Sequence, residues 1–515
     1  MLSVERAFPS VGVNRGFGES EPGEKAGDRG HGRFVTPDRV DWYGHGRARR
    51  RRSRIDGKFM MCPKTSVPVL ASLLVVGQGC SLLEPSPGAG VENVIVLSVD
   101  ALTRRALSTY DPAANELPHL DRFSRGAVVF TNAFTSASWT LPAHASLFTG
   151  LYPDRHGLVR PGKKLAKDQK TLTTLLHERG FETVGFTGGE FLMGSFGFGK
   201  GFERYDGRTA SRGWRPSLRL HQAGSEDGEL FDRAVAYLRD VGRGDRPFFL
   251  FLHTYYVHDY YKSDESEELK ECILGTKGCS PAVWDDLRER YDQRLRDFDD
   301  GFGRLLAAME KTGLDESTLL IVLSDHGEGF EPERGRIHHA GRLQEDVIRI
   351  PLLVAGPHLS HRVVDENVSL VDVLPTVAEL LGIPADESLD GVSFAKSLYR
   401  ASSPRQSTQP RTLFAMEHAY RWQDGKRIGF RAADERATSV AVIHRNLYYI
   451  REGDREELYD IKADPEQERD LARGSLDLTP FRDAAKKRDG FEVGGEAMQI
   501  DRELEDRLRS LGYIR

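Results

Sequence analysis

Cysteine is scarce in this chain of 515 residues, which contains only Cys62, Cys80, Cys272 and Cys279. If the first two belong to an export signal, two thiols remain, and this number argues against a metal site built from cysteines alone. Cys272 and Cys279 lie in a polar segment that contains glycine. We expect them to close a small disulfide hairpin in an oxidising compartment, with two free thiols as the alternative.

An excess of positive charge is also absent, because 72 lysines and arginines against 78 aspartates and glutamates give a net charge of −6. Nucleic-acid-binding proteins carry a basic footprint, so we expect no nucleic-acid partner. The one dense basic run, Arg47–Arg54, lies within residues 1–59. It is either an arm for a nucleic acid or membrane surface, or part of an extension that precedes a start at Met60 or Met61. We expect residues 1–59 to be disordered or non-native.

Long apolar segments are missing too, since the run Val67–Val76 is too short for an ordinary transmembrane helix. Small residues lead from it to Cys80, and a linker rich in Pro, Gly and Ser follows. This pattern resembles a bacterial lipoprotein signal in which Cys80 is lipidated after cleavage, although Gly77 stands where Leu or Val is usual. We expect a signal peptide at 60–80, a linker at 81–91, export to the periplasm or cell envelope, and membrane attachment through the lipidated cysteine. A plain cleaved signal peptide and an uncleaved anchor are the alternatives.

The rest of the sequence alternates short apolar runs with stretches of helical periodicity. The apolar runs, which fit strands buried on both faces, are Val94–Val99, Phe248–Leu252, Leu319–Leu323 and Pro351–Val354. The stretches with helical spacing are Leu172–Glu178, Phe231–Leu238, Tyr291–Met309 and Val371–Leu381. This alternation predicts an α/β fold over residues 92–407, with a mostly parallel sheet between layers of helices.

The pattern changes after residue 408 or so. Ser439–His444 and Asn446–Arg451 alternate apolar and polar residues, as antiparallel strands do. We expect residues 408–515 to form a small C-terminal α+β subdomain with a four-stranded or similar antiparallel sheet and a terminal helix.

Polar side chains follow three of the predicted strands. Asp100 follows the first, His253 the second, and the sequence Ser-Asp-His-Gly-Glu at 324–328 the third. In a parallel sheet, ligands bind at the edge formed by the carboxyl ends of the strands. Any one of these residues could be an ordinary strand-end cap, but all three together with Thr140 indicate metal or phosphate chemistry.

Five segments resemble the signatures of the sulfatase-like family of the alkaline phosphatase superfamily, in family order. They are 93–100 (NVIVLSVD), 140–152 (TLPAHASLFTGLY), 324–328 (SDHGE), 341–351 ending in IRIP, and 458–472 (LYDIKADPEQERDLA). The resemblance spans residues 92–515. It implies an alkaline-phosphatase-like core and a metal-dependent hydrolase of sulfate or phosphate esters.

The resemblance also implies roles for single residues. Asp100, Asp325, His326 and Thr140 match the family's metal-ligand positions, and Thr140 also occupies the position of the nucleophile, at the expected start of a helix. The free N–H groups and dipole of a helix amino terminus favour a bound anion. A hydroxyl is a poor nucleophile at neutral pH, and coordination to a metal is one way to activate it.

The chain departs from the family pattern at four positions, two of which are among these ligand positions. Sulfatases carry a Cys or Ser nucleophile that is oxidised to an aldehyde, whereas oxidation of Thr140 would give a ketone. His144 replaces an Arg, Ala101 replaces a second Asp, and His326 replaces an Asn. Imidazole suits zinc or manganese better than calcium. We therefore expect one or two divalent ions, a phosphodiester or phosphonate substrate in preference to a sulfate ester, and a phosphothreonine intermediate, as in relatives that use a metal-bound threonine.

Further histidines complete the predicted site. In the family, a substrate-binding or ligating histidine lies where this chain has His253 and His258, and an anion-contacting side chain lies where it has His338 and His339. We expect His144, His258 and His339 to be catalytic, and His253 and His338 to bind substrate. Participation of these histidines in a second metal site is the alternative.

Two other functions stay open. One is a transferase that passes a phospho-substituent to a lipid or glycan, and the other is a non-catalytic binding protein. Such transferases often carry several membrane-spanning helices, whereas this chain has at most one short apolar run. The four predicted metal-ligand positions all hold residues that can bind metal, which argues against a non-catalytic protein. We therefore expect a hydrolase of small-molecule, glycan or lipid esters, in which Glu328 supports the ligands and Glu190 lines the pocket.

Overall fold

The computed structural model describes residues 87–498 apart from 189, 208–224, 242–243, 245, 262–279, 332–335, 385, 400–409, 419, 424–425, 430–438 and 490–494. All four cysteines lie outside the described residues, so the disulfide and the lipidation stay predictions. Within the described part of the chain, no helix has the length and apolar character that crossing a membrane requires.

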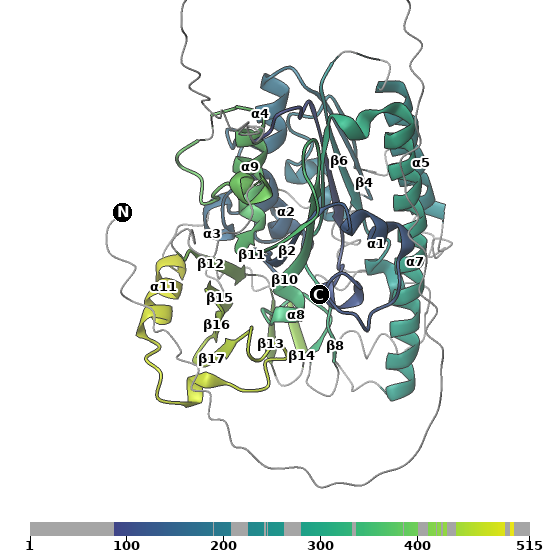
Figure 1. Cartoon of the computed structure of the whole chain (residues 1–515). Coiled ribbons are helices and arrows are strands. Elements are labelled where there is room, and N and C mark those ends of the chain that lie inside the picture. The colour runs from purple at the N-terminus through teal and green to yellow at the C-terminus, as the bar shows by residue number, and fades with distance from the viewer. Residues whose placement is uncertain are drawn as a thin grey trace, which may run out of the picture. The chain divides into compact units, whose positions relative to one another are not determined.

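An eight-stranded sheet forms the centre of the fold (Figure 1). Its strands, in spatial order, are β11 (Arg362–Ser369), β2 (Val128–Phe134), β10 (Arg349–Ala355), β7 (Thr318–Ser324), β1 (Asn93–Val99), β6 (Phe248–Thr254), β4 (Glu182–Thr187) and β5 (Arg204–Gly207). Only β10 runs antiparallel to its neighbours; the other pairings are parallel. The predicted mostly parallel sheet is confirmed.

Alternate residues of the central strands feed two separate cores. Val94 and Val96 of β1 pack on one face, and Ile95 and Leu97 pack on the other, because successive side chains of a strand point to opposite faces. The first core is covered by α2 (Thr140–Thr149), α4 (Leu172–Glu178) and α9 (Val373–Leu380). The second is covered by α1 (Pro118–Ser124), α5 (Ser225–Val241) and α7 (Pro281–Thr312), as Figure 1 shows. The helix layers are therefore as predicted.

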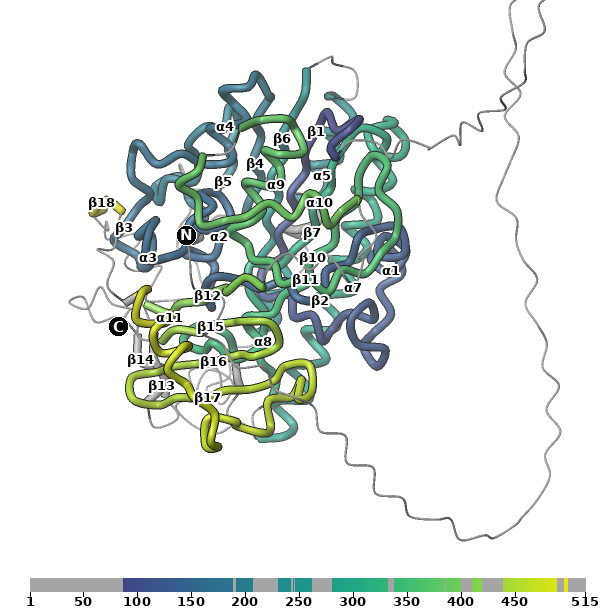
Figure 2. Tube along the Cα trace, turned by 60° about the vertical axis from the view of Figure 1, so that its left-hand side comes forward, coloured from purple at the N-terminus to yellow at the C-terminus, as the bar shows by residue number. Residues whose placement is uncertain are grey.

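A second, antiparallel sheet lies in the C-terminal part of the chain (Figure 2). Its strands, in order, are β12 (Thr412–Glu417), β15 (Ser439–His444), β16 (Leu447–Glu452) and β17 (Arg455–Asp460). One face packs on Phe134 and Val347 of the main core, and the other packs under α11 (Thr479–Asp489) through Phe481. The predicted C-terminal α+β part with an antiparallel sheet is confirmed, while its exact limits stay predictions.

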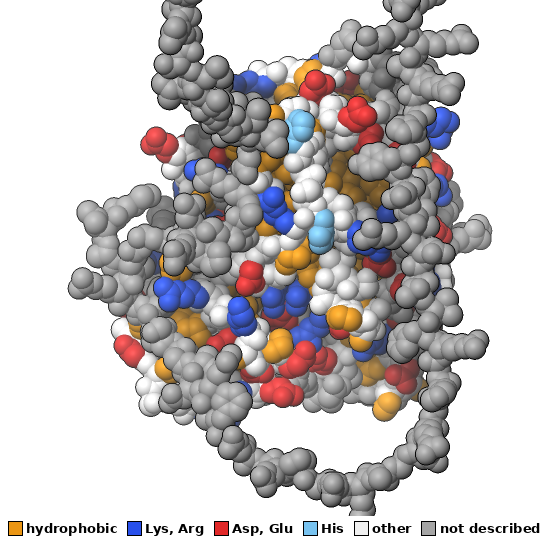
Figure 3. Space-filling model, in the orientation of Figure 1, with side chains coloured by type: hydrophobic (Ala, Val, Ile, Leu, Met, Phe, Trp, Pro, Cys, Tyr) orange, Lys and Arg blue, Asp and Glu red, His pale blue; other side chains and the backbone are white. Residues whose placement is uncertain are grey.

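Shorter elements connect these layers. The helices are α3 (Pro153–His156), α8 (Glu345–Ile348) and α10 (Ala395–Tyr399). The short strands are β3 (Lys163–Lys164), β8 (Phe330–Glu331), β9 (Arg336–Ile337), β13 (Tyr420–Gln423), β14 (Lys426–Gly429) and β18 (Glu496–Ala497). The 3-10 segments are η1 (Arg104–Ala106), η2 (Glu190–Leu192), η3 (Gly194–Phe196), η4 (His258–Tyr261), η5 (Leu314–Glu316), η7 (Leu370–Asp372) and η8 (Leu471–Arg473). On the face drawn in Figure 3, acidic and basic side chains of the described residues are intermixed.

His156, at the end of α3, is a buried histidine that joins α3 to α2. Its Nδ1 accepts the N–H of Leu158 at 3.1 Å, so its Nε2 carries the proton and lies 3.1 Å from the hydroxyl of Ser146. Burial, with a smaller contribution from His418, lowers the pKa of His156 to about 3. The folded protein therefore holds this ring in the neutral form.

We predict that His156→Asn makes the protein less sensitive to acid. The folded pKa of this histidine lies below its unfolded value, so its contribution to stability is complete above about pH 6.5 and is lost as the pH falls from there towards 3. Between pH 7.5 and 5.5 the parent should lose about 1.4 kcal/mol more free energy of unfolding than the variant. Urea titrations at the two pH values measure this difference, and equal losses would contradict the assignment.

Candidate active site and metal centre

Three adjacent strands deliver the predicted ligands to one edge of the main sheet. Val99 of β1 pairs with Thr254 of β6 on one side and with Ser324 of β7 on the other. Because both pairings are parallel, the residues at and after these strand ends meet at the same edge. The side chains brought together there, none more than 1% exposed, are those of Asp100, His253, Asp325 and His326.

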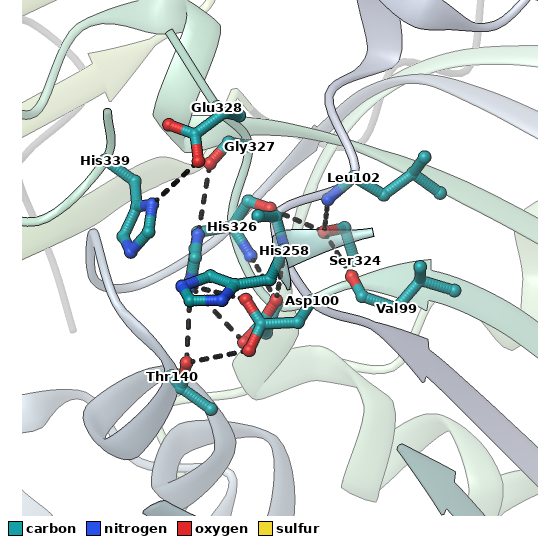
Figure 4. Close-up of polar contacts among 12 residues, drawn as sticks. Val99, Asp100, Leu102, Thr140, His258, Ser324, His326, Gly327, Glu328 and His339 are labelled. Atoms are coloured by element: carbon teal, nitrogen blue, oxygen red, sulfur yellow. Dashed lines mark hydrogen bonds and ion pairs between the residues drawn. The ribbon is translucent and has the colours of Figure 1, made fainter. Parts of the chain in front are cut away.

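The turns after β1 and β7 are fixed by internal hydrogen bonds (Figure 4). The hydroxyl of Ser324 lies 2.7 Å from the carbonyl oxygen of Val99 and accepts the N–H of Leu102 at 3.0 Å. Ala101 adopts a left-handed φ of 57°, a conformation that costs a residue other than glycine about 1 kcal/mol. Its N–H donates to Asp325 Oδ1 at 3.3 Å, and its carbonyl accepts the hydroxyl of Tyr291 at 2.9 Å. This strained turn fixes the position of Asp100 relative to Asp325.

Thr140 reaches the same edge from a fourth strand. The chain leaves the carboxyl end of β2, passes through residues 135–139, and enters α2 at Thr140, which is 2% exposed. The Thr140 Oγ1 lies 3.2 Å from Asp100 Oδ2 and 3.4 Å from His326 Nε2 (Figure 4). The amino terminus of α2, with its unpaired N–H groups and positive dipole end, therefore lies next to the aspartates and His326.

The ring of His326 presents a lone pair to these carboxylates. Its Nδ1 lies 3.0 Å from the carbonyl oxygen of Gly327, which can only accept, so Nδ1 carries the proton and Nε2 does not. Nε2 lies 3.4 Å from both Asp100 Oδ1 and Asp325 Oδ2, and neither oxygen has a hydrogen-bond partner. Three buried electron pairs that face one another repel unless a cation lies between them.

These atoms fit a divalent cation. A tetrahedral shell with bonds of about 2.1 Å has edges of about 3.4 Å between neighbouring ligand atoms. The separations of His326 Nε2 from Asp100 Oδ1, Asp325 Oδ2 and Thr140 Oγ1 are each 3.4 Å. Burial, reinforced by the negative charge of Asp100, raises the pKa of Asp325 well above its ordinary value. Ionisation of both carboxylates therefore requires a compensating positive charge.

His144 lies one turn along α2 from Thr140. Its Nδ1 donates to the carbonyl oxygen of Thr140 at 2.9 Å, and its Nε2 lies 3.0 Å from the hydroxyl of Ser98 in β1. Burial, with a further contribution from His253, lowers the pKa of His144 well below its ordinary value, so the neutral ring accepts the Ser98 hydroxyl. His144 thus joins α2 to β1 and holds the backbone of Thr140, while its predicted catalytic role stays a prediction.

His253 packs beside both His144 and the metal-ligand candidates, and His144 Nδ1 itself lies 3.7 Å from Asp325 Oδ2. Its ring meets that of His144 edge to face at a centroid distance of 4.5 Å. Its Nε2 lies 3.6 Å from Asp100 Oδ2, and neither ring nitrogen has a hydrogen-bond partner. His253 is therefore placed to contact a cation or the substrate beside Asp100.

A second cluster adjoins the first. Glu328, His338 and His339 offer ligand atoms that all lie within 4.8 Å of one another. His339 Nδ1 lies 3.1 Å from Glu328 Oε2, a contact that orients the ring. The ring of His339 stacks on that of His326 at 4.3 Å, and the ring of His258 lies 5.3 Å from it. The histidines expected from the sequence therefore surround one continuous site.

The site carries three buried carboxylates, those of Asp100, Asp325 and Glu328, each at most 2% exposed. Their contacts among the described residues are to histidines, hydroxyls and backbone N–H groups, and include no lysine or arginine. Buried charges require pairing or metal coordination. One divalent cation would leave this set of carboxylates with a net negative charge, and two would not.

Some residues of the site were not foreseen, and others are not described. Tyr291 supports the turn at Ala101, but the sequence indicated it only as part of a helix. Ser98 and Ser324 lie in the segments 93–100 and 324–328, but nothing in those segments indicated that they bond to His144 and to the turn after β1. The side chain of Glu190 lies outside what the structure describes.

Comparison with known proteins shows similarity in sequence and in fold. A family model described as sulfatase matches residues 92–383. Human arylsulfatase A is 26% identical over 79% of this chain and 87% of its own length. The multifunctional alkaline phosphatase superfamily protein PehA of Trinickia caryophylli is 25% identical over 72% of this chain and 88% of its own. The phosphonate monoester hydrolase of Agrobacterium radiobacter has a similar fold, with a TM-score of 0.58 and 18% identity over 77% of this chain and 94% of its own.

We predict that a chelator lowers the Tm of the protein, because it leaves the facing carboxylates uncompensated. A metal present at 100 times its Kd stabilises the folded state by about 2.7 kcal/mol. Asp325→Asn has one carboxylate fewer to neutralise, so addition of EDTA should lower its Tm by less than it lowers the Tm of the parent. In EDTA the Tm of Asp325→Asn should equal or exceed that of the parent. Thermal unfolding with parallel metal analysis measures both effects. Loss of the metal without any fall in the parent Tm would contradict the proposed ligand set.

Proposed function

The chain belongs to the sulfatase family of the alkaline phosphatase superfamily, whose members are metal-dependent ester hydrolases, and we propose that this hydrolase uses Thr140 as its nucleophile. The observation that carries the proposal is the position of the threonine hydroxyl. It lies at the amino terminus of α2, within 3.4 Å of both Asp100 Oδ2 and His326 Nε2. The residue at this helix start is a threonine and not a cysteine or serine.

The proposed ion site consists of Asp100, Asp325, His326 and Thr140. A divalent cation held there would act as a Lewis acid that lowers the pKa of the threonine hydroxyl and neutralises charge on the ester oxygens. The imidazole of His326 favours zinc or manganese over calcium, which prefers ligands that are all oxygen. His144 Nδ1 holds the backbone carbonyl of Thr140 in place, and the positive end of the α2 dipole favours negative charge beside the hydroxyl.

The proposed reaction has two steps. Thr140 Oγ1 attacks the phosphorus atom, a new O–P bond forms, and the bond from phosphorus to the leaving oxygen breaks. The hydroxyl donates a hydrogen bond to Asp100 Oδ2 at 3.2 Å. Burial alone would raise the pKa of Asp100, but the neighbouring histidines, His258 first, hold it well below its ordinary value, so the hydroxyl proton would pass to solvent. Water then attacks the phosphothreonine and restores the free hydroxyl. His258 and His339 are proposed to donate a proton to the leaving oxygen or to accept one from the water.

The choice of phosphorus over sulfur rests on the identity of the nucleophile. Oxidation of Thr140 would give a ketone, so the aldehyde hydrate that attacks sulfate esters in formylglycine enzymes cannot form. A threonine hydroxyl activated by a bound cation would, in contrast, attack phosphorus directly and accept the phosphoryl group. We therefore propose a phosphodiester or phosphonate monoester as substrate, on a small molecule, glycan or lipid, with a sulfate ester as the second choice.

The amino-terminal sequence supports a location of this enzyme in the cell envelope. We propose export through a signal at 60–80 and attachment to the cell envelope through Cys80, followed by a linker at 81–91, a catalytic domain at 92–407 and a C-terminal subdomain at 408–515. Lipidation would hold the enzyme near lipid or glycan esters.

We propose a second ion in the cluster of Glu328, His338 and His339. The support is their convergence within 4.8 Å and the three buried carboxylates of the site. Two divalent ions would neutralise these carboxylates and leave one positive charge, which suits a singly charged diester or phosphonate monoester. A pair of ions can also stabilise the attacking and leaving oxygens.

The first prediction concerns Thr140. Thr140→Ala should reduce kcat/KM for p-nitrophenyl phosphodiester, phosphonate and sulfate substrates by about a thousandfold or more, because no hydroxyl remains to attack. The control Thr140→Ser keeps the hydroxyl and should stay within about tenfold of the parent. Parent activity led by the sulfate ester would contradict the substrate class. Parent-like activity of Thr140→Ala would exclude Thr140 as nucleophile, and an inactive parent would favour a binding protein.

The second prediction concerns metal content. Parent protein should hold two zinc or manganese ions per chain by elemental analysis, and Glu328→Gln should hold one, because it loses a charged ligand only from the second cluster. Asp325→Asn should affect the first ion instead. A single ion in the parent, unchanged in Glu328→Gln, would show that the second cluster does not bind metal.

A further inference from the structure

The segment between β2 and α2, residues 135–139, carries Thr140 to its position and is held from two sides. The N–H of Thr135 donates to the carbonyl oxygen of Ile348 at 2.8 Å. The carbonyl oxygen of Ser136 accepts the N–H of Met416 at 2.9 Å. Met416 belongs to β12, the edge strand of the C-terminal sheet. The backbone that precedes the nucleophile is therefore bonded to the C-terminal part of the chain.

Glu417, the last residue of β12, adds a side-chain bond at the same place. Its side chain is 0% exposed, and its Oε2 accepts hydrogen bonds from the hydroxyl of Ser138 and from the N–H of Gly341, the latter at 3.1 Å. The N–H of Gly341 also lies 3.2 Å from Ser138 Oγ. One carboxylate oxygen thus joins two loops that are distant in the sequence.

These two loops carry different halves of the site. Ser138 lies two residues before Thr140, and Gly341 lies two residues after His339. Bonds to a buried carboxylate are stronger than those between neutral groups. Gly341 has a φ of 90°, which is unfavourable for residues that carry a side chain. The hydrogen bonds of the Gly341 N–H help to hold the loop after His339 in this backbone conformation.

We propose that Glu417 is a positioning residue, which sets the separation of Thr140 from His339 and so couples the C-terminal sheet to the active site. The proposal rests on the proposed function, since it assigns Thr140 and His339 to one reaction. Displacement of a reacting group by about 1 Å can reduce turnover by about a hundredfold. Glu417 itself touches neither the nucleophile nor the ligand candidates in the described contacts.

The test compares Glu417→Ala and Glu417→Gln with the matched control Glu457→Ala. Glu457 is a buried glutamate of β17 in the same sheet, 8% exposed, and it pairs with Arg455. Steady-state kinetics on the best phosphorus ester, metal content and Tm are measured for each full-length protein. Glu417→Ala should lower kcat by about tenfold or more, with KM within about threefold and metal content unchanged.

The glutamine variant separates hydrogen bonding from other effects. Its amide oxygen can still accept from Ser138 and Gly341, so Glu417→Gln should recover most of the lost kcat. Glu457→Ala should lower Tm and leave kcat at the parent value. If Glu417→Ala does not fold, Ser138→Ala removes one of the bonds and should lower kcat by a smaller factor.

Two results would overturn the proposal. One is a parent-like kcat in Glu417→Ala, or in Ser138→Ala where that variant replaces it. The other is a loss of kcat in Glu457→Ala equal to that in Glu417→Ala, which would show general destabilisation. Thr140→Ala, measured in parallel, distinguishes failure of this proposal from failure of the proposed function, because activity in that variant would show that the proposed nucleophile is wrong.

Discussion

Parallel pairing of β1 with β6 and β7 is the constraint on which this site depends. Val99 lies between Thr254 and Ser324 in the sheet, so the residues that follow these strands have one edge in common. A shift of register by one residue would turn Asp100 into the opposite layer, because strand side chains alternate between faces. The hydrogen bonds of Ser324 and the left-handed turn at Ala101 hold this register at the edge itself.

The chemistry follows from what the constraint brings together. Asp100 and Asp325 are buried against the unprotonated nitrogen of His326, an arrangement that a cation stabilises. The same position receives the hydroxyl of Thr140 from the start of α2. Stability and reactivity therefore have one origin: the aspartates that disfavour the folded state without a cation are those that would hold the cation beside the nucleophile.

The sequence predicted the parts of the fold that depend on local pattern. The buried apolar runs correspond to β1, β6, β7 and β10, and the stretch of helical spacing at Leu172–Glu178 has the same limits as α4. Strand β2, with its mixed sequence VVFTNAF, gave no such signal, and neither did the antiparallel direction of β10, which depends on distant partners. Dependence on distant partners also explains which residues of the site could not be predicted. Strand-end ligands have a motif, whereas Glu417 acts across a gap in sequence of 279 residues from Ser138 and has none.

The central claim, a covalent step through Thr140, is tested most directly by trapping the intermediate. The parent protein is mixed with a p-nitrophenyl phosphodiester or phosphonate, quenched in acid within the first turnover, and digested for peptide mass spectrometry. We expect the transferred phosphoryl group on Thr140 and on no other residue, and we expect it to disappear as substrate is exhausted. Turnover that leaves Thr140 unmodified at every quench time, or that modifies another side chain, would contradict the account.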